Sequence, residues 1–379
     1  MRPKDDSSVA NDKANGFRDC ERSALKPVDR ESFGLVQVLR GIAASWVVLF
    51  HASEGHHIDR LKESIPTWTH PIFDVGNNGV AIFFALSGFV IAHSLRNDHI
   101  SFGYLGRFAL RRSIRLDPAL WASIALFIGF AALSSFVKSE SFAAPSTAVI
   151  LSNATYTQLF LGVPSINPVY WTLCYEVQFY LVLVLCVMAA QRFGRLVYLV
   201  PFAVAVAWGC GVLEQPVAGL FVDRWHCFYL GALAYWAVKS DRALVGFALL
   251  LVALAAARPD LFTVICMLTA AGLLVAGKTG FIRNGLAWRP LLFLGTVSYS
   301  LYLTHNPVAG AAFFLLEKAG VPQWASLVIS CAACVTAAAA FWFVIERPTM
   351  RLAHRVKLPR SREVVSGFAS DAEITPQNA

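Results

Sequence analysis

Long runs of apolar residues alternate with short polar segments along most of this chain of 379 residues. Most runs reach the roughly 17 to 25 residues that cross a bilayer as an α-helix. The pattern therefore predicts an all-α polytopic membrane protein with about ten transmembrane helices. The shortest run is 243–257, which is followed by Arg258-Pro259-Asp260. This region could instead form one long kinked hairpin, which would not change the number of crossings. The runs cover residues 35–53, 73–95, 116–137, 169–190, 195–213, 220–238, 243–257, 260–277, 291–315 and 322–345.

Lysine and arginine are distributed unevenly between the two sides that this pattern defines. With the N-terminus in the cytoplasm, 25 of the 32 Lys and Arg residues fall on the cytoplasmic side and five on the outer side. This bias is the positive-inside signature, so we expect both the N- and C-termini to be cytoplasmic. The net charge of +8 then reflects topology, and no basic stretch interleaved with aromatic residues indicates a nucleic acid partner.

Composition supports a lipid environment, since the chain is 56% hydrophobic and 15% charged, with a mean hydropathy of +0.56. We expect a disordered cytoplasmic tail at 1–34, a membrane-embedded domain at 35–350 and a cytoplasmic tail at 351–379. The first segment is polar and mixed in charge, which is not typical of a cleavable signal peptide. The first helix is therefore expected to remain as an anchor.

Two polar residues in the first run are the strongest candidates for chemistry. Arg40 and His51 are eleven residues apart, so on a helix they return to one face after three turns, roughly 16 Å along the axis. Such groups are costly in hydrocarbon and usually mark a functional site. With the N-terminus inside, Arg40 lies in the inner leaflet and His51 near the outer surface.

The next two runs add a serine and a cluster of arginines. Ser87 lies among small residues, where helix packing and a role in a site are about equally good explanations. Arg111, Arg112 and Arg115 lie together, and we expect Arg111 and Arg115 to share a helix face with Arg112 beside them. Three guanidinium groups form a receptor for phosphate, although positive-inside anchoring explains any single one. We expect Asp117-Pro118 to start the third span.

Glu176 is placed about two turns into the fourth span, an expensive position for a carboxylate without a partner. It could orient His51, pair with Arg40 or Arg224, or bind an acceptor hydroxyl. A structural ion pair is the alternative. We prefer a functional role, because intramembrane carboxylates are functional by default.

The ninth run carries a stripe of polar side chains. Ser298, Tyr302 and His305 have the spacing i, i+4, i+7 of one helix face. Hydroxyl and imidazole groups buried together suit the hydroxyls of a carbohydrate, while hydrogen bonding between helices explains them as well. The sequence FWFVIERP ends the tenth run, and Glu346-Arg347-Pro348 is interpreted as a helix stop with a local ion pair.

Other chemistries are not indicated. His51, His56 and His57 do not place three ligands on one helix face, so no metal site is expected. Cys331 and Cys334 lie within an apolar run, which favours packing over redox chemistry. The sequence contains no phosphate-binding loop, dinucleotide fingerprint or nucleophile elbow.

Taken in order, these motifs resemble the integral-membrane acyltransferase 3 family of sugar and antibiotic O-acyltransferases. The resemblance extends from Leu35 to about Met350. Ala81 departs from the pattern, because family members often have an acidic residue there, and Glu176 is therefore the preferred carboxylate partner. The matching elements are LRGIAASWVVLFH, NGVAIFFALSGFVI, RRSIR with Pro118, YWTLCYEVQFYL with Trp171, FYLGAL with Gly231, GTVSYSLYLTHNP and VIERP.

The resemblance implies a multi-pass enzyme of the bacterial inner (plasma) membrane that moves an acyl group, most often acetyl, from acyl-CoA to a hydroxyl. Acetyl-CoA is then a co-substrate, and no permanently bound cofactor is expected. His51 is implied as the catalytic residue. The donor-side residues are Arg40, Arg111, Arg112 and Arg115, and those for the acceptor or its support are Ser87, Trp171, Ser298, Tyr299, Tyr302 and His305.

The expected mechanism has His51 acting as general base with Glu176 as its orienting partner, while an acyl-histidine intermediate stays open. The acceptor is expected to be an exopolysaccharide, a lipopolysaccharide or a lipid-linked sugar. The alternative is a transporter or flippase for a polar or glycosylated small molecule, which would be expected to show inverted repeats and paired broken helices. A non-catalytic scaffold would tolerate loss of Arg40 and His51.

Overall fold

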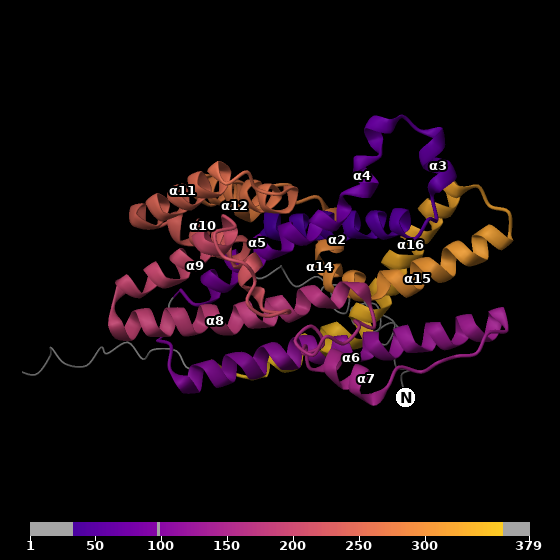
Figure 1. Ribbon diagram of the computed structural model, residues 1–379, viewed down its shortest axis with the longest axis horizontal. Helices are drawn as coiled ribbons and strands as arrows, with labels where there is room; N and C mark the ends of the chain where they lie inside the picture. Colours follow the sequence, from indigo (N-terminus) through magenta and orange to yellow (C-terminus); the bar gives the residue numbers. More distant parts are fainter. Residues whose placement is uncertain (1–32, 97–98, 359–379) are drawn as a thin grey trace, which may run out of the picture.

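The computed structural model describes residues 33–96 and 99–358, and all regular structure within these ranges is helical (Figure 1). Nearly all of the predicted N-terminal tail and most of the predicted C-terminal tail lie outside the described residues. The α-helices are α2 (Gly34–Glu54), α3 (Asp59–Ser64), α4 (Pro71–Asp74), α5 (Gly79–Ser94), α6 (Phe102–Lys138), α7 (Thr147–Ala154), α8 (Trp171–Phe193), α9 (Leu199–Gly209), α10 (Trp225–Ala237), α11 (Asp241–Ala256), α12 (Leu261–Thr279), α13 (Phe281–Asn284), α14 (Arg289–Thr296), α15 (Ser298–Lys318), α16 (Gln323–Phe341) and α17 (Arg347–Arg355).

Every predicted apolar run overlaps at least one of these helices. Within the described ranges, 6 helical segments are long and apolar enough to cross a membrane by length and composition. The described part of the protein is thus all-helical with several candidate membrane spans, while the total of about ten crossings stays a prediction. The six segments are Gly34–Glu54, Gly76–Ser94, Phe102–Lys138, Pro168–Phe193, Leu261–Thr279 and Gln323–Arg355.

Two predicted boundaries at prolines are wrong. Helix α6 begins at Phe102, where the Ser101 side chain accepts a hydrogen bond from the backbone of Tyr104, so Pro118 lies inside the helix rather than at its start. At the other end of the chain, α16 does not stop before Pro348. It passes through a π-helical turn, Trp342–Glu346, into α17. The wider turn relieves the clash that a proline ring makes with the preceding helical turn.

The predicted ninth span is divided at Val297 into α14 and α15. Helix α14 lies against α2 at a close crossing of two glycines. A Cβ atom on Gly295 would lie 2.0 Å from the carbonyl oxygen of Gln37, and one on Gly41 would lie 2.8 Å from the backbone nitrogen of Gly295. The contact brings the start of α15 beside the first half of α2.

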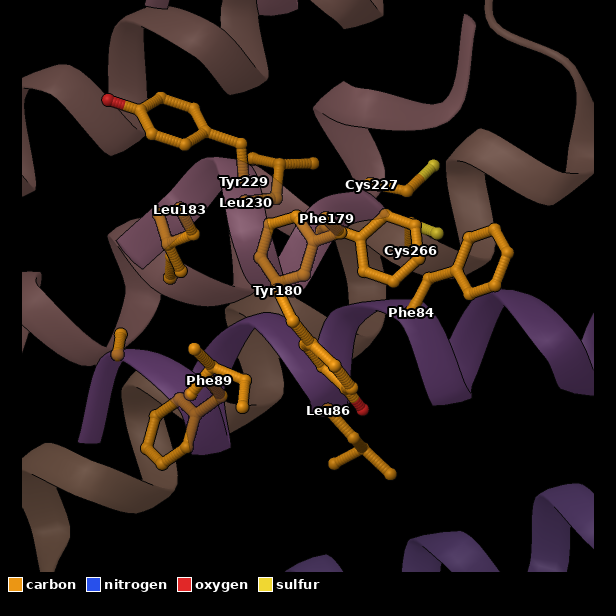
Figure 2. Packing of buried hydrophobic residues seen from close by; sticks show 14 of the residues in the cluster. Phe84, Leu86, Phe89, Phe179, Tyr180, Leu183, Cys227, Tyr229, Leu230 and Cys266 are labelled. Carbon is orange, nitrogen blue, oxygen red and sulfur yellow. The ribbon is translucent and has the colours of Figure 1, made fainter. Parts of the chain in front are cut away.

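The core forms where α5 crosses α10, and nearly all residues of α10 are buried. Gly88 and Gly231 allow the two backbones to meet, because a Cβ on either would lie within 2 Å of a carbonyl oxygen of the other helix. Around this crossing the ring of Phe228 is stacked between Phe84, at 4.0 Å, and Phe179 of α8, at 4.4 Å. Figure 2 shows Phe84 and Phe179 in this packing together with side chains of α10 and α12.

Candidate active site

Helices α2 and α15 run side by side in the same direction. Arg40 contacts Ser298 near the start of α15, the ring of His51 lies 5.1 Å from that of His305, and the ring of His57 stacks on Phe313. The two helices therefore present a shared polar stripe along their length. Each end of the stripe opens on a separate cavity.

The first cavity, here called the arginine cavity, has a volume of about 210 Å³ and lies between α2, α5, α6, α8 and α15. Arg40, Arg112 and Arg115 all line it, as do Glu176 and Tyr180. The structure thus brings Arg40 of α2 to the same cavity as two arginines of α6. Three guanidinium groups around one cavity make it strongly attractive to an anion.

Neighbouring side chains hold two of these arginines, Arg40 and Arg112, through contacts that involve no carboxylate. The Nε of Arg40 donates to the Ser298 hydroxyl at 3.2 Å, and the Arg112 guanidinium lies 4.4 Å from the centre of the Tyr180 ring. In the part of the chain that the structure describes, none of the three arginines has a carboxylate within 4.0 Å. Their remaining N–H groups are available to a ligand.

Arg111 does not belong to this receptor. Its guanidinium contacts the Nδ1 of His354 on α17 at 2.9 Å, and it does not line the cavity. The expectation that Arg111 and Arg115 act from the same face is corrected, since Arg112 and Arg115, three residues apart, are the pair that converges on the ligand space. Arg111 ties α6 to α17.

Glu176 lies in the arginine cavity and not beside His51. Its Oε1 accepts hydrogen bonds from the hydroxyl of Ser87, at 2.8 Å, and from that of Tyr180. The predicted contact between Glu176 and His51 is therefore absent, because the two residues line different cavities. Ser87 does face the cavity, where it holds this carboxylate in place.

His51 has a different carboxylate partner, which the sequence analysis missed. The Nδ1 of His51 lies 2.7 Å from the Oε2 of Glu54, one turn further along α2. The spacing H-x-x-E in the sequence is the signal that could have identified it. This contact fixes the imidazole ring and leaves its Nε2 for other chemistry.

The second cavity, at the His51 end, has a volume of about 640 Å³. It is lined by His51, Glu54 and His57, by seven residues of α6 between Phe127 and Lys138 that do not include Gly129, and by eight residues of α15 between Asn306 and Glu317. Partial burial lowers the pKa of His57, which lies beyond the end of α2, so its imidazole is neutral at pH 7. The cavity thus places one fixed imidazole and one neutral imidazole at its α2 end.

His305 lies behind His51 and is fully buried. Its Nδ1 is 3.0 Å from the carbonyl oxygen of Leu301 and 2.9 Å from that of Tyr302, which fixes the proton on Nδ1. Among the described residues its Nε2 has no hydrogen-bond partner. His305 therefore packs against the ring of His51, the predicted catalytic residue. Its Nε2 is a hydrogen-bond acceptor that no described residue uses.

The other predicted acceptor-side residues have separate positions. Tyr299 and Tyr302 line the arginine cavity with Ser298. The Tyr299 hydroxyl donates to the carbonyl of Leu116, and the Tyr302 hydroxyl lies 2.8 Å from that of Thr172. Trp171 packs edge-on against the rings of Phe84 and Tyr175 and lines neither cavity, so the structure gives it a packing role.

Glu346 is a second buried carboxylate near the arginines. Its Oε2 accepts a hydrogen bond of 2.6 Å from the Ser300 hydroxyl, and its charge interacts with those of Arg115 and Arg40. The interpretation of Glu346 as part of a helix stop is therefore wrong. The sequence carries no local signal for this contact, because Ser300 and Glu346 come from different helices.

Among the described residues, no group of three or more His, Cys, Asp or Glu side chains is arranged to hold a metal ion. The chemistry of the two cavities is instead that of an anion receptor and an imidazole–carboxylate pair. One receives negatively charged groups, and the other can accept a proton from a hydroxyl.

Comparison with protein families matches residues 35–345 to the acyltransferase domain of the acyltransferase 3 family. Nodulation protein 10 of Rhizobium leguminosarum bv. viciae is similar over 375 residues at 28% identity, which covers 85% of this chain and 94% of that protein. No solved structure matches. The matched segment contains all of the cavity-lining residues named above, and Glu346 directly follows it.

Proposed function

This chain belongs to the acyltransferase 3 family, and we propose on this basis that it transfers an acyl group, acetyl first, from acyl-CoA to a hydroxyl of a carbohydrate acceptor. One observation carries the proposal. Arg40 and His51, on one face of α2, open on two different cavities, roughly 16 Å apart along the helix. An anion receptor and a base at that separation suit a long donor that is charged at one end and reactive at the other.

The donor binds from the cytosol at the arginine cavity. The cavity is too small for the nucleotide of CoA, whose phosphates therefore stay at the mouth near Arg112 and Arg115. The pantetheine arm is thin and neutral and passes between the helices. Arg40, held by Ser298, lies on the path of that arm toward His51.

His51 is the general base. The imidazole takes the proton of the acceptor hydroxyl, and the oxygen attacks the thioester carbonyl; an ester C–O bond forms, the C–S bond breaks, and the CoA thiolate receives the proton. Glu54 orients the ring and stabilises the imidazolium that forms between the two steps. The acceptor occupies the second cavity, beside His51.

The membrane arrangement proposed is a multi-pass protein of the bacterial inner membrane with about ten crossings and cytoplasmic termini. Arg112 and Arg115 then face the cytosol, where acyl-CoA is found. The second cavity lies in the outer half of the bilayer, so the acceptor is modified on the side away from the donor's nucleotide.

The test is release of CoA from acetyl-CoA by purified protein in lipid nanodiscs, with and without acceptor. His51→Ala is expected to lower turnover by about 10²–10⁴-fold, the usual contribution of general acid–base catalysis, with donor binding retained. Arg115→Ala is expected to weaken donor binding. Arg195→Ala, which removes an exposed arginine outside the cavity, is the matched control and should change neither quantity.

A wild-type protein that neither binds nor consumes acetyl-CoA or a longer acyl-CoA would contradict the proposal. The transporter alternative would then come first, since it requires no release of CoA. Full turnover by His51→Ala would also contradict the role given to His51.

A further inference from the structure

The cavity beside His51, here called the α6–α15 groove, is far larger than a transferred acetyl group requires. Phe127, Phe130 and Leu133 of α6 face Pro307 and Phe314 of α15 across it. His51 and Glu54 supply hydrogen-bonding groups at the reacting site, and Ser134, Lys138 and Glu317 supply others toward the ends of α6 and α15. The groove therefore has polar groups at the reacting site and at its far end, with an apolar wall between them.

The helix that forms one wall also faces the hydrocarbon of the bilayer. Outside the groove, the side chains of Trp121 and Phe136 on α6 are 52% and 81% exposed, and Leu133 and Val137 at the edge of the groove are 57% and 49% exposed. Large apolar side chains exposed in series on a membrane helix are in contact with lipid. A molecule that resides in the bilayer can thus enter the groove sideways, without crossing a polar surface.

A hydrocarbon chain fits this wall, whereas a free sugar does not. A sugar against Phe127 or Phe314 would lose its water without gaining hydrogen-bond partners. A hydrocarbon chain moves from lipid to the groove at little cost, because the two environments are about equally apolar. The chemistry of the wall therefore selects an amphiphile over a soluble glycan.

Building on the function proposed above, we propose that the acceptor is a membrane-resident glycolipid bound in the α6–α15 groove. Its sugar headgroup lies at the α2 end, with one hydroxyl at His51, and its hydrocarbon chain lies between α6 and α15. The apolar wall determines which acceptors bind, and His51 with Glu54 determines where the acyl group is added.

Two glycines allow a matched test. Gly310 lines the groove, and a Cβ added there meets no atom within 4 Å, so the side chain of Gly310→Leu starts in open space and extends into the groove. A Cβ added to Gly129 of α6 also meets no atom within 4 Å, and Gly129 is exposed and does not line the groove. Gly129→Leu therefore adds the same side chain to the lipid-facing surface alone.

The probe is dodecyl maltoside with a photoactivatable diazirine in its alkyl chain, applied to the full-length protein in nanodiscs. The expected result is labelling of residues 127–137 and 307–315 that excess unlabelled dodecyl maltoside competes away and methyl maltoside does not. Gly310→Leu should weaken this saturable labelling at least about tenfold, which corresponds to about 1.4 kcal/mol. Gly129→Leu should leave it unchanged.

The proposal would be overturned if the groove were labelled no more strongly than α12. It would also be overturned if labelling of the groove were unchanged in Gly310→Leu. A Gly310→Leu protein that hydrolyses octanoyl-CoA more slowly but acetyl-CoA normally would overturn it too, because the groove would then hold the donor's acyl chain. Release of CoA from acetyl-CoA is measured on the same nanodiscs. If CoA is released normally but the groove is not labelled, the glycolipid site is refuted and the proposed acyltransferase activity stands. If the groove is labelled but no CoA is released, the proposed acyltransferase activity is refuted.

Discussion

At the scale of single residues, the contact between Glu54 and His51 carries the sharpest prediction. Glu54→Gln keeps a hydrogen-bonding side chain beside Nδ1 but removes the charge that orients the ring and stabilises the imidazolium. We expect kcat to fall by about tenfold or more, yet by less than the 10²–10⁴-fold expected of His51→Ala. The Kd for acetyl-CoA should not change, since Glu54 lies at the other cavity.

Two further variants separate a positioning role from a loss of folding. Glu63→Gln removes an exposed carboxylate from nearby α3 and should leave kcat at the wild-type value. Glu54→Asp should recover part of the lost rate, because it restores the charge at a slightly greater distance. An unchanged kcat in Glu54→Gln would assign the orientation of His51 to another group.

At this scale helix periodicity places residues on a common face, but it does not identify the partner of each side chain. The i, i+11 spacing of Arg40 and His51 and the stripe from Ser298 to His305 follow from helix periodicity alone. The expectation that Glu176 is the partner of His51 depended on how α8 packs, which no periodicity encodes. The role of Glu346 required the contact of α15 with the turn after α16.

At the scale of helices, the crossing of α5 and α10 depends on glycines. A Cβ on Gly88 would lie 1.8 Å from the carbonyl oxygen of Phe228, and one on Gly231 would lie 1.9 Å from that of Ala85. Gly88→Ala and Gly231→Ala must therefore separate the two backbones, which costs about 1–3 kcal/mol or more. Both should lower the Tm of the purified protein clearly.

Gly272→Ala on α12 is the control for this pair, since the added Cβ meets nothing within 4 Å. Alanine favours the helix over glycine by about 1 kcal/mol, so this variant should keep or raise the Tm. A Gly88→Ala protein as stable as the wild type would mean that the crossing is not tight.

The helices themselves were largely predictable, because a bilayer demands long apolar segments whose backbone groups are paired within the segment. Their ends at prolines were not. Because proline usually marks helix boundaries, the sequence predicts that a helix starts at Pro118 and that another stops at Pro348. Both helices continue, one through a long α-helix and one through a π turn, and the sequence alone does not show how neighbouring structure accommodates each ring.

At the scale of the whole molecule, the directions of the packed helices bear on the proposed topology. If each apolar run crosses once, the first and ninth crossings have the same direction, as do the second and sixth. Helices α2 and α15 run parallel, and so do α5 and α10, where Phe84 meets Phe228 and Phe89 meets Tyr235. Helices α6 and α17 run antiparallel, as a third and a tenth crossing must.

Labelling from one side of the membrane tests this topology. We expect a membrane-impermeant maleimide to modify Glu140→Cys, just after α6, in intact spheroplasts, because the proposed order of crossings puts that loop outside. Lys239→Cys, between α10 and α11, should react only after lysis. Both positions are exposed, so access to the reagent depends on the side of the membrane alone, and the wild-type chain measures the background of its own cysteines. The reverse pattern would place the arginine cavity on the outer side, away from cytosolic acyl-CoA, and would contradict the proposed path of the donor.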